Sequence, residues 1–84
     1  MSIYVDRATH PLGRMKMSHM LADTVDELHK MAEQIGLKRE WFQSHGTPHY
    51  DLCQEKRKLA IELGAVVVGR RELVAIMRRL RVAS

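Results

Sequence analysis

The stretch HGTPHYD at residues 45–51 gathers two imidazoles, a phenol and a carboxylate within seven positions. Imidazoles bind metal ions and move protons near neutral pH, and a neighbouring carboxylate can orient them for either task. His49 and Asp51 are therefore candidate catalytic residues. The H-x3-H spacing of His45 and His49 carries little weight, because the glycine and proline between them disfavour a helix. The alternative is a polar turn in which Asp51 caps a following helix.

Two further groups of this kind lie far away in the sequence, at Asp6 and His19. Together with His49 and Asp51 they could hold a divalent metal ion that assists hydrolysis. Either histidine would then be the general acid or base, and the two carboxylates would orient the histidines or bind the metal. The sequence has no H-E-x-x-H or C-x2-C pattern and only one cysteine, so the presence of a metal cofactor stays open.

Arginine and aromatic residues could bind a phosphate-bearing ligand. Gly13 before Arg14 would let a guanidinium in a loop swing onto a phosphate, where it can bind two oxygens. Tyr50 or Trp41 could stack on a nucleobase, although core packing is the alternative use of such rings. The predicted ligand-binding residues are Asp6, Arg7, Arg14, His19, His49, Tyr50 and Arg70.

Composition narrows the class of protein. The chain has 84 residues, 45% of them hydrophobic, and a net charge of +4, which predicts one folded domain over residues 1–84 with anionic partners. Because so short a chain builds a small core, we expect a homo-oligomer. No apolar run approaches the roughly 20 residues of a membrane span. The start MSIYVDR also lacks the pattern of a signal peptide, so we expect a cytoplasmic protein without a membrane partner.

Hydrophobic periodicity predicts three strand-then-helix units. The strands are expected at residues 3–6, 41–43 and 65–68, the last as a strand buried on both faces. Residues 41–43 could instead be an aromatic plug beneath a loop. The helices are expected from Thr24 to Gly36, from Asp51 to Leu63 and over residues 70–81.

Local signals mark where these helices begin and end. Thr24 and Glu27 match a capping box, and Gly36 supplies the left-handed residue that ends the first helix. Gly64 would end the second helix in the same way. Residues 7–23 are expected to be a long loop, with at most one helical turn around residues 18–21.

The order β-α-β-α-β-α predicts an α/β fold with a small three-stranded parallel sheet. Ligands of open α/β sheets bind at the carboxyl edge, where parallel strands end together. The candidate histidines, carboxylates and arginines would meet at that edge, and helix N-termini there would favour anions. The predicted site therefore depends on topology and not on a short motif.

Several segments taken together resemble a known family. IYVD, GRMKMSHMLADT, DELHKMAEQIGL, WFQ, PHYD and LGAVVVGRREL, spread over about residues 3–80, are similar to small bacterial and phage proteins catalogued as domain of unknown function 4031. The matching positions are Asp6, Gly13, Arg14, Ser18, His19, Asp23, Glu27, Leu28, His29, His49, Tyr50, Asp51, Gly64 and Ala65. Met20 departs from the leucine expected there. The resemblance implies no activity, but it suggests a phage origin and hence the capture of host defence signals.

Three functions are consistent with these residues. The first is a binding module for a phosphate-bearing small molecule, such as a nucleotide or cyclic nucleotide. The second is a metal-assisted or histidine-dependent phosphodiesterase that uses the same site, so whether the protein is an enzyme stays open. The third is nucleic-acid binding through the arginine-rich last helix, although the chain has no helix-turn-helix or RNP signature. His29, beside the apolar stripe of its helix, is expected to be a partly buried structural residue.

Overall fold

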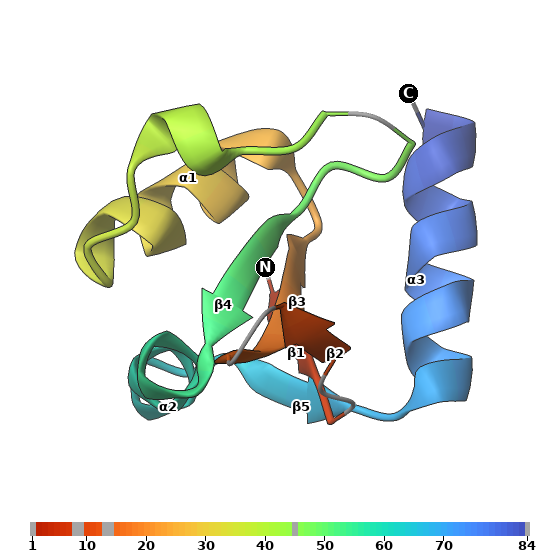
Figure 1. The fold of residues 1–84 in the computed structure, drawn as a ribbon. Coiled ribbons are helices and arrows are strands. Elements are labelled where there is room, and N and C mark those ends of the chain that lie inside the picture. The colour runs from red at the N-terminus through yellow and green to blue at the C-terminus, as the bar shows by residue number, and fades with distance from the viewer. Residues whose placement is uncertain (1, 8–9, 13–14, 45, 84) are drawn as a thin grey trace.

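The computed structural model describes residues 2–7, 10–12, 15–44 and 46–83. It has an α/β fold with one sheet, as predicted, and helices on both faces of that sheet (Figure 1). The elements in chain order are β1 (Ile3–Asp6), β2 (His10–Leu12), β3 (Met15–Ala22), α1 (Val25–Gln34), a 3-10 helix (Arg39–Trp41), β4 (Tyr50–Cys53), α2 (Gln54–Glu62), β5 (Val66–Val68) and α3 (Arg70–Ala83). Within the described residues, no helix is both long and apolar enough to cross a membrane.

The sheet is mixed and has five strands, so the predicted three-stranded parallel sheet is wrong. The strand order is β2-β3-β1-β5, and β4 also pairs with β3. Met17 pairs with both His10 of β2 and Cys53 of β4, and Met20 pairs with both Val5 of β1 and Tyr50 of β4. Strands β1 and β2 therefore share one edge of β3, and β4 lies along the other edge.

Strand β3 is the longest of the described strands and lies within the segment expected to be a loop, so the predicted helical turn at residues 18–21 is also wrong. Its sequence, MKMSHMLA, is poor in the β-branched and aromatic residues that favour strands. The strand forms because neighbours pair with it on both edges, which overrides its weak local preference. Antiparallel pairing places β3 between β1 and β4, while β1 and β5 are parallel.

The second predicted strand and helix both begin later in the chain than expected. Residues 41–43 form no strand: a 3-10 helix ends at Trp41, and Gln43 makes an isolated bridge with His49. Phe42 packs against the core, which agrees with the alternative of an aromatic plug. Asp51 lies within β4 and does not cap a helix; α2 begins three residues later, after Cys53.

Helix α1 confirms its predicted ends. The Thr24 hydroxyl accepts the Glu27 backbone N–H at 3.2 Å, which satisfies a donor that the first turn leaves unpaired. At the other end, Gly36 has φ +81° and the Leu37 N–H donates to the Ala32 carbonyl at 2.8 Å. This left-handed ending suits glycine, which has no side chain to strain.

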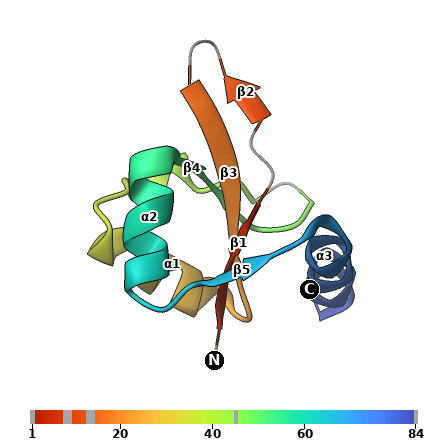
Figure 2. The same cartoon turned by 90° about the horizontal axis from the view of Figure 1, so that it is seen from below.

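Two cores flank the sheet, with α1 and α2 on one face and α3 on the other (Figure 2). Val5, Met20 and Tyr50 face the first core, while Leu21 and Val68 face the second. Successive strand residues point to opposite faces, so these positions fix the face of every other strand residue. The third predicted strand is confirmed as β5, but it is an edge strand whose Val66 is 47% exposed, so it is not buried on both faces.

Candidate functional site

Three of the candidate residues meet on the sheet face that carries α3. His19 of β3 and Asp51 of β4 are directly opposite each other in the antiparallel register. His49 precedes Asp51 by two residues, so its side chain lies on the same face. Each of the three offers one ligand atom, and these atoms all lie within 4.8 Å of one another.

His19 is held by Asp6, the last residue of β1. One carboxylate oxygen accepts the His19 backbone N–H at 3.0 Å, and the other lies 2.8 Å from Nδ1 of the ring. Asp6 is buried, with a side chain only 3% exposed, so it has little freedom to turn away. Because a carboxylate accepts, Nδ1 donates to Asp6, and Nε2 lies on the side of Asp51, 3.9 Å from Oδ1. This carboxylate–histidine pair is the arrangement that orients metal-binding histidines.

A backbone carbonyl orients the His49 ring in the way that the Asp6 carboxylate orients the His19 ring. Its Nδ1 lies 2.8 Å from the carbonyl oxygen of Thr47, which can only accept, so Nδ1 donates. Its Nε2 lies 3.6 Å from Oδ1 of Asp51. The two imidazole rings meet edge to face, with centroids 5.5 Å apart and planes at 67°.

Asp51 differs from the two histidines in its hydrogen bonding, which is incomplete among the described residues. The Gln43 side-chain amide donates to its Oδ2 at 2.7 Å. Its Oδ1 is buried and has no hydrogen-bond partner among the described residues. The two nearby imidazole nitrogens, at 3.6 and 3.9 Å, are too distant for hydrogen bonds. A buried carboxylate oxygen without a partner costs free energy unless a cation or a water molecule contacts it.

The arrangement suits a divalent transition metal. Two imidazoles and one carboxylate are the protein ligands of many catalytic zinc sites, which leave a fourth position for water. Ligands about 2.1 Å from a tetrahedral ion are about 3.4 Å apart, close to the observed nitrogen–oxygen separations. The three side chains are 18–31% exposed, so the group is accessible from solvent.

Other predicted ligand-binding residues lie elsewhere. Tyr50 is 1% exposed and faces the opposite core, which does not fit the predicted stacking on a ligand. Its hydroxyl is 2.8 Å from Nδ1 of His29, and burial raises the pKa of Tyr50. His29 is itself buried, which agrees with the burial predicted for it beside the apolar stripe of its helix. Gly13, Arg14 and His45, with the predictions made for them, fall outside the described residues.

Arg7 and Arg70 follow the carboxyl ends of the paired strands β1 and β5. Asp6 pairs with Val68 in the parallel register, and the Arg7 backbone N–H donates to the Val68 carbonyl at 3.2 Å. Arg70 begins α3 two residues later. Both arginine side chains are exposed, and among the described residues neither has a carboxylate partner. The carboxyl edge of β1 and β5 thus carries two available guanidinium groups.

Two residues of the site were missed by sequence reasoning. Gln43 orients Asp51, and the Thr47 carbonyl orients His49. Gln43 reaches Asp51 because it forms a two-way backbone bridge with His49, at 3.0 Å in each direction. No local sequence signal marks such a bridge between a loop and a strand.

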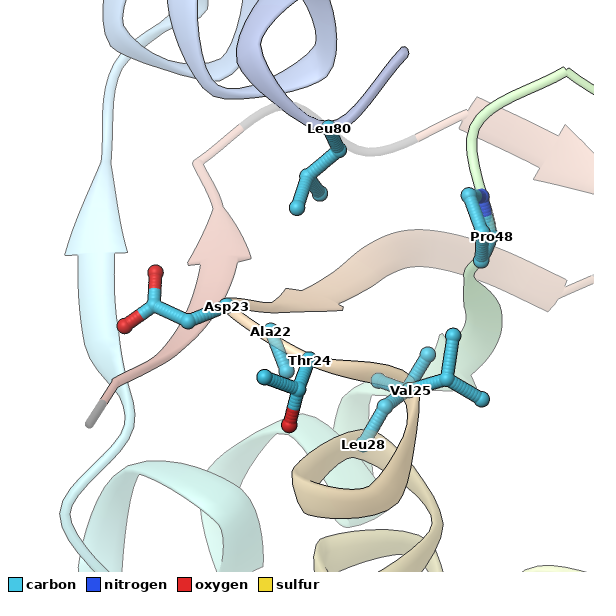
Figure 3. A pocket seen from close by; sticks show the side chains of 7 residues that line it. All are labelled: Ala22, Asp23, Thr24, Val25, Leu28, Pro48 and Leu80. Atoms are coloured by element: carbon cyan, nitrogen blue, oxygen red, sulfur yellow. The ribbon is translucent and has the colours of Figure 1, made fainter. Parts of the chain in front are cut away.

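Two cavities lie near this region. One of about 490 Å³ is lined by Met17, Leu37, Trp41, Gln43, Asp51, Cys53 and Lys56, and so adjoins the site through Gln43 and Asp51. The other, of about 250 Å³, lies between the start of α1 and the end of α3 (Figure 3). Asp23 is the one ionisable side chain among the described residues that line the second cavity, and its carboxylate points away from Leu80 and Pro48. The first cavity is therefore the one connected to the candidate chemistry.

Residues 3–80 match the family model described as a protein of unknown function, DUF4031, and the chain belongs to this family. No curated protein matches the chain. No solved structure matches it either.

Proposed function

We propose that this protein is a metal-dependent hydrolase of phosphate esters, with a zinc-like ion held by His19, His49 and Asp51. The observation that carries the proposal is Oδ1 of Asp51, which faces two imidazole nitrogens and has no hydrogen-bond partner among the described residues. Without a cation, this buried carboxylate oxygen has no hydrogen-bond partner in the part of the chain that the structure describes. With one, all three inward atoms become ligands while Asp6, Thr47 and Gln43 keep the outer atoms bonded.

A bound zinc ion would supply a water molecule of lowered pKa and a positive charge for a phosphate oxygen. The water would lose one proton to solvent, its oxygen would form the new bond to phosphorus, and the bond from phosphorus to the leaving oxygen would break. The leaving alkoxide would take up one proton from solvent, so that the step balances. Arg7 and Arg70 support the choice of a phosphate ester, because they follow the carboxyl ends of β1 and β5 and are exposed without carboxylate partners among the described residues.

The metal is tested by titrating Zn²⁺ into metal-free protein in a calorimeter. We expect one ion per chain, and an affinity at least about 100-fold lower for His49→Ala and Asp51→Asn, since each removes a ligand. Asp26→Asn is the matched control, because Asp26 is exposed on α1. Equal zinc affinity in wild type and Asp51→Asn would contradict the metal site.

Turnover is tested with methyl p-nitrophenyl phosphate, whose cleavage releases a coloured product. We expect zinc-dependent release that His49→Ala abolishes while the variant keeps its fold by circular dichroism. Zinc binding together with intact recovery of the ester would instead favour the capture of a phosphate-bearing molecule, including a host defence nucleotide. Assembly into a homo-oligomer and a cytoplasmic location stay predictions, and native mass spectrometry tests the first of them.

A further inference from the structure

We infer that the 490 Å³ cavity beside Asp51 holds a nucleobase, so that the phosphate ester bound by this protein is a nucleoside phosphate. The inference rests on the proposed function for the position of the phosphate. Its own basis is the shape and lining of the cavity. The volume falls within the range of about 300–1,000 Å³ that is typical of small-molecule sites.

The floor of the cavity continues the site along the same two strands. Met17 and Cys53 form the cross-strand pair two residues from the pair His19 and Asp51. Residues two apart on a strand lie on the same face and about 7 Å from each other. If the phosphate of a ligand contacts the metal position, a sugar is long enough to bring the attached base over Met17 and Cys53.

The walls offer a stacking surface. Trp41 lines the cavity and is 50% exposed, which is unusual for the largest apolar side chain. The Lys38 ammonium lies 5.6 Å from the centre of the Trp41 ring and makes a cation–π contact with it. Leu37 is buried beside it as part of the first core, so the wall is anchored. A planar base can stack on the Trp41 ring, since stacking needs a flat, preformed face.

Polar groups at the rim match the edge of a base. Gln43, Asp51 and Lys56 line the cavity beside the apolar residues. The Gln43 amide already donates to Asp51, so its orientation is fixed. Lys56 has no carboxylate partner among the described residues, and its ammonium can donate to a ring nitrogen or carbonyl of a base.

The fluorescence of Trp41, the one tryptophan of the chain, reports directly on the occupancy of this cavity. We expect saturable quenching by adenosine 5′-monophosphate, tighter with zinc present, and none by ribose 5-phosphate at equal concentration. Cys53→Phe fills the floor with a residue that strands tolerate, and it should weaken nucleotide binding by about 10-fold or more. Val66→Phe, an equally large substitution on the exposed edge strand β5 outside the cavity, is the matched control and should bind as wild type does.

The outcomes separate this inference from the proposed function. Quenching by the nucleotide without zinc binding or ester cleavage would retain the base site and overturn the hydrolase. Zinc-dependent cleavage of methyl p-nitrophenyl phosphate without any quenching by the nucleotide would do the reverse. Equal quenching by ribose 5-phosphate, or unchanged affinity in Cys53→Phe when circular dichroism shows a native fold, would overturn the base site.

Discussion

Two pairs of polar rings lie on opposite faces of the same sheet and differ in how fully they are satisfied. On the α1 and α2 face, His29 and Tyr50 share a buried hydrogen bond of 2.8 Å, and Phe42 packs against both rings. On the α3 face, His19 and His49 meet around a carboxylate oxygen that has no hydrogen-bond partner among the described residues. Both clusters contain histidine, so the residue type alone does not decide the role of the side chain. The hydrogen-bond partners around each ring decide it.

Removing the buried histidine should have the largest effect on stability. His29→Ala leaves a cavity between Phe42 and Tyr50 and removes the partner of the Tyr50 hydroxyl, so we expect a loss of about 3 kcal/mol in the free energy of unfolding. Urea denaturation of the metal-free protein measures this loss. His49→Ala should cost less than about 1 kcal/mol in the same experiment, and a reversed order would break the comparison.

Changing the residue behind His19 should weaken the metal site without removing a ligand. In Asp6→Asn, one of the two oxygens that accept from His19 becomes an amide N–H donor, which leaves the ring or the backbone N–H without its acceptor. We expect zinc affinity to fall about 10- to 100-fold, the usual effect of losing such a partner. Calorimetric titration measures the affinity, and an unchanged value would show that Asp6 does not orient His19 for a metal.

Removing the Tyr50 hydroxyl would leave only ring contacts in the buried pair of His29 and Tyr50. Tyr50→Phe keeps the buried ring but leaves Nδ1 of His29 without its partner, so we expect a loss of about 1–2 kcal/mol in the free energy of unfolding. Zinc affinity should not change, because Tyr50 faces the other core. A weaker zinc affinity in a variant with a native circular dichroism spectrum would mean that the two faces are coupled.

Asp23 belongs to a third polar cluster. It tests whether complete hydrogen bonding, and not position on one face of the sheet, distinguishes a structural cluster from the candidate site. Its carboxylate accepts from the Tyr4 hydroxyl, the Ser2 backbone N–H and Arg79, and the Tyr4 hydrogen bond is the main cause that lowers the pKa of Asp23. A lowered folded-state pKa stabilises the protein above the ordinary value of 3.8, and this contribution is lost as the pH falls through the folded-state value.

For this partly exposed group we expect Asp23→Asn to cost less than about 1 kcal/mol at neutral pH. The difference from wild type should disappear in strong acid, because both side chains are then neutral. Urea denaturation of both proteins across this pH range measures it. A difference that persists unchanged into strong acid would mean that hydrogen-bond geometry, and not ionisation of Asp23, is responsible.

Much of the local structure could be predicted from the chain. The ends of α1 follow from Thr24 and Gly36, and β5 and α3 follow from their apolar patterns. Strand β3 could not be predicted, because its residues prefer a strand only weakly and pairing on both edges decides the outcome. Asp51 was assigned to a helix start for a related reason: aspartate is a good cap, but its strand partner lies 32 positions earlier, at His19.

The sequence alone determined the residue types that could do chemistry, and Asp6, His19, His49 and Asp51 were among the candidates named from it. The expected reason for their meeting, a shared edge of parallel strands, was wrong. Only the tertiary structure decided that β3 runs antiparallel between β1 and β4, which places His19 between Asp6 and Asp51 on one face. Long-range strand pairing has no local signature, because it depends on how far-separated segments share hydrogen bonds and cores.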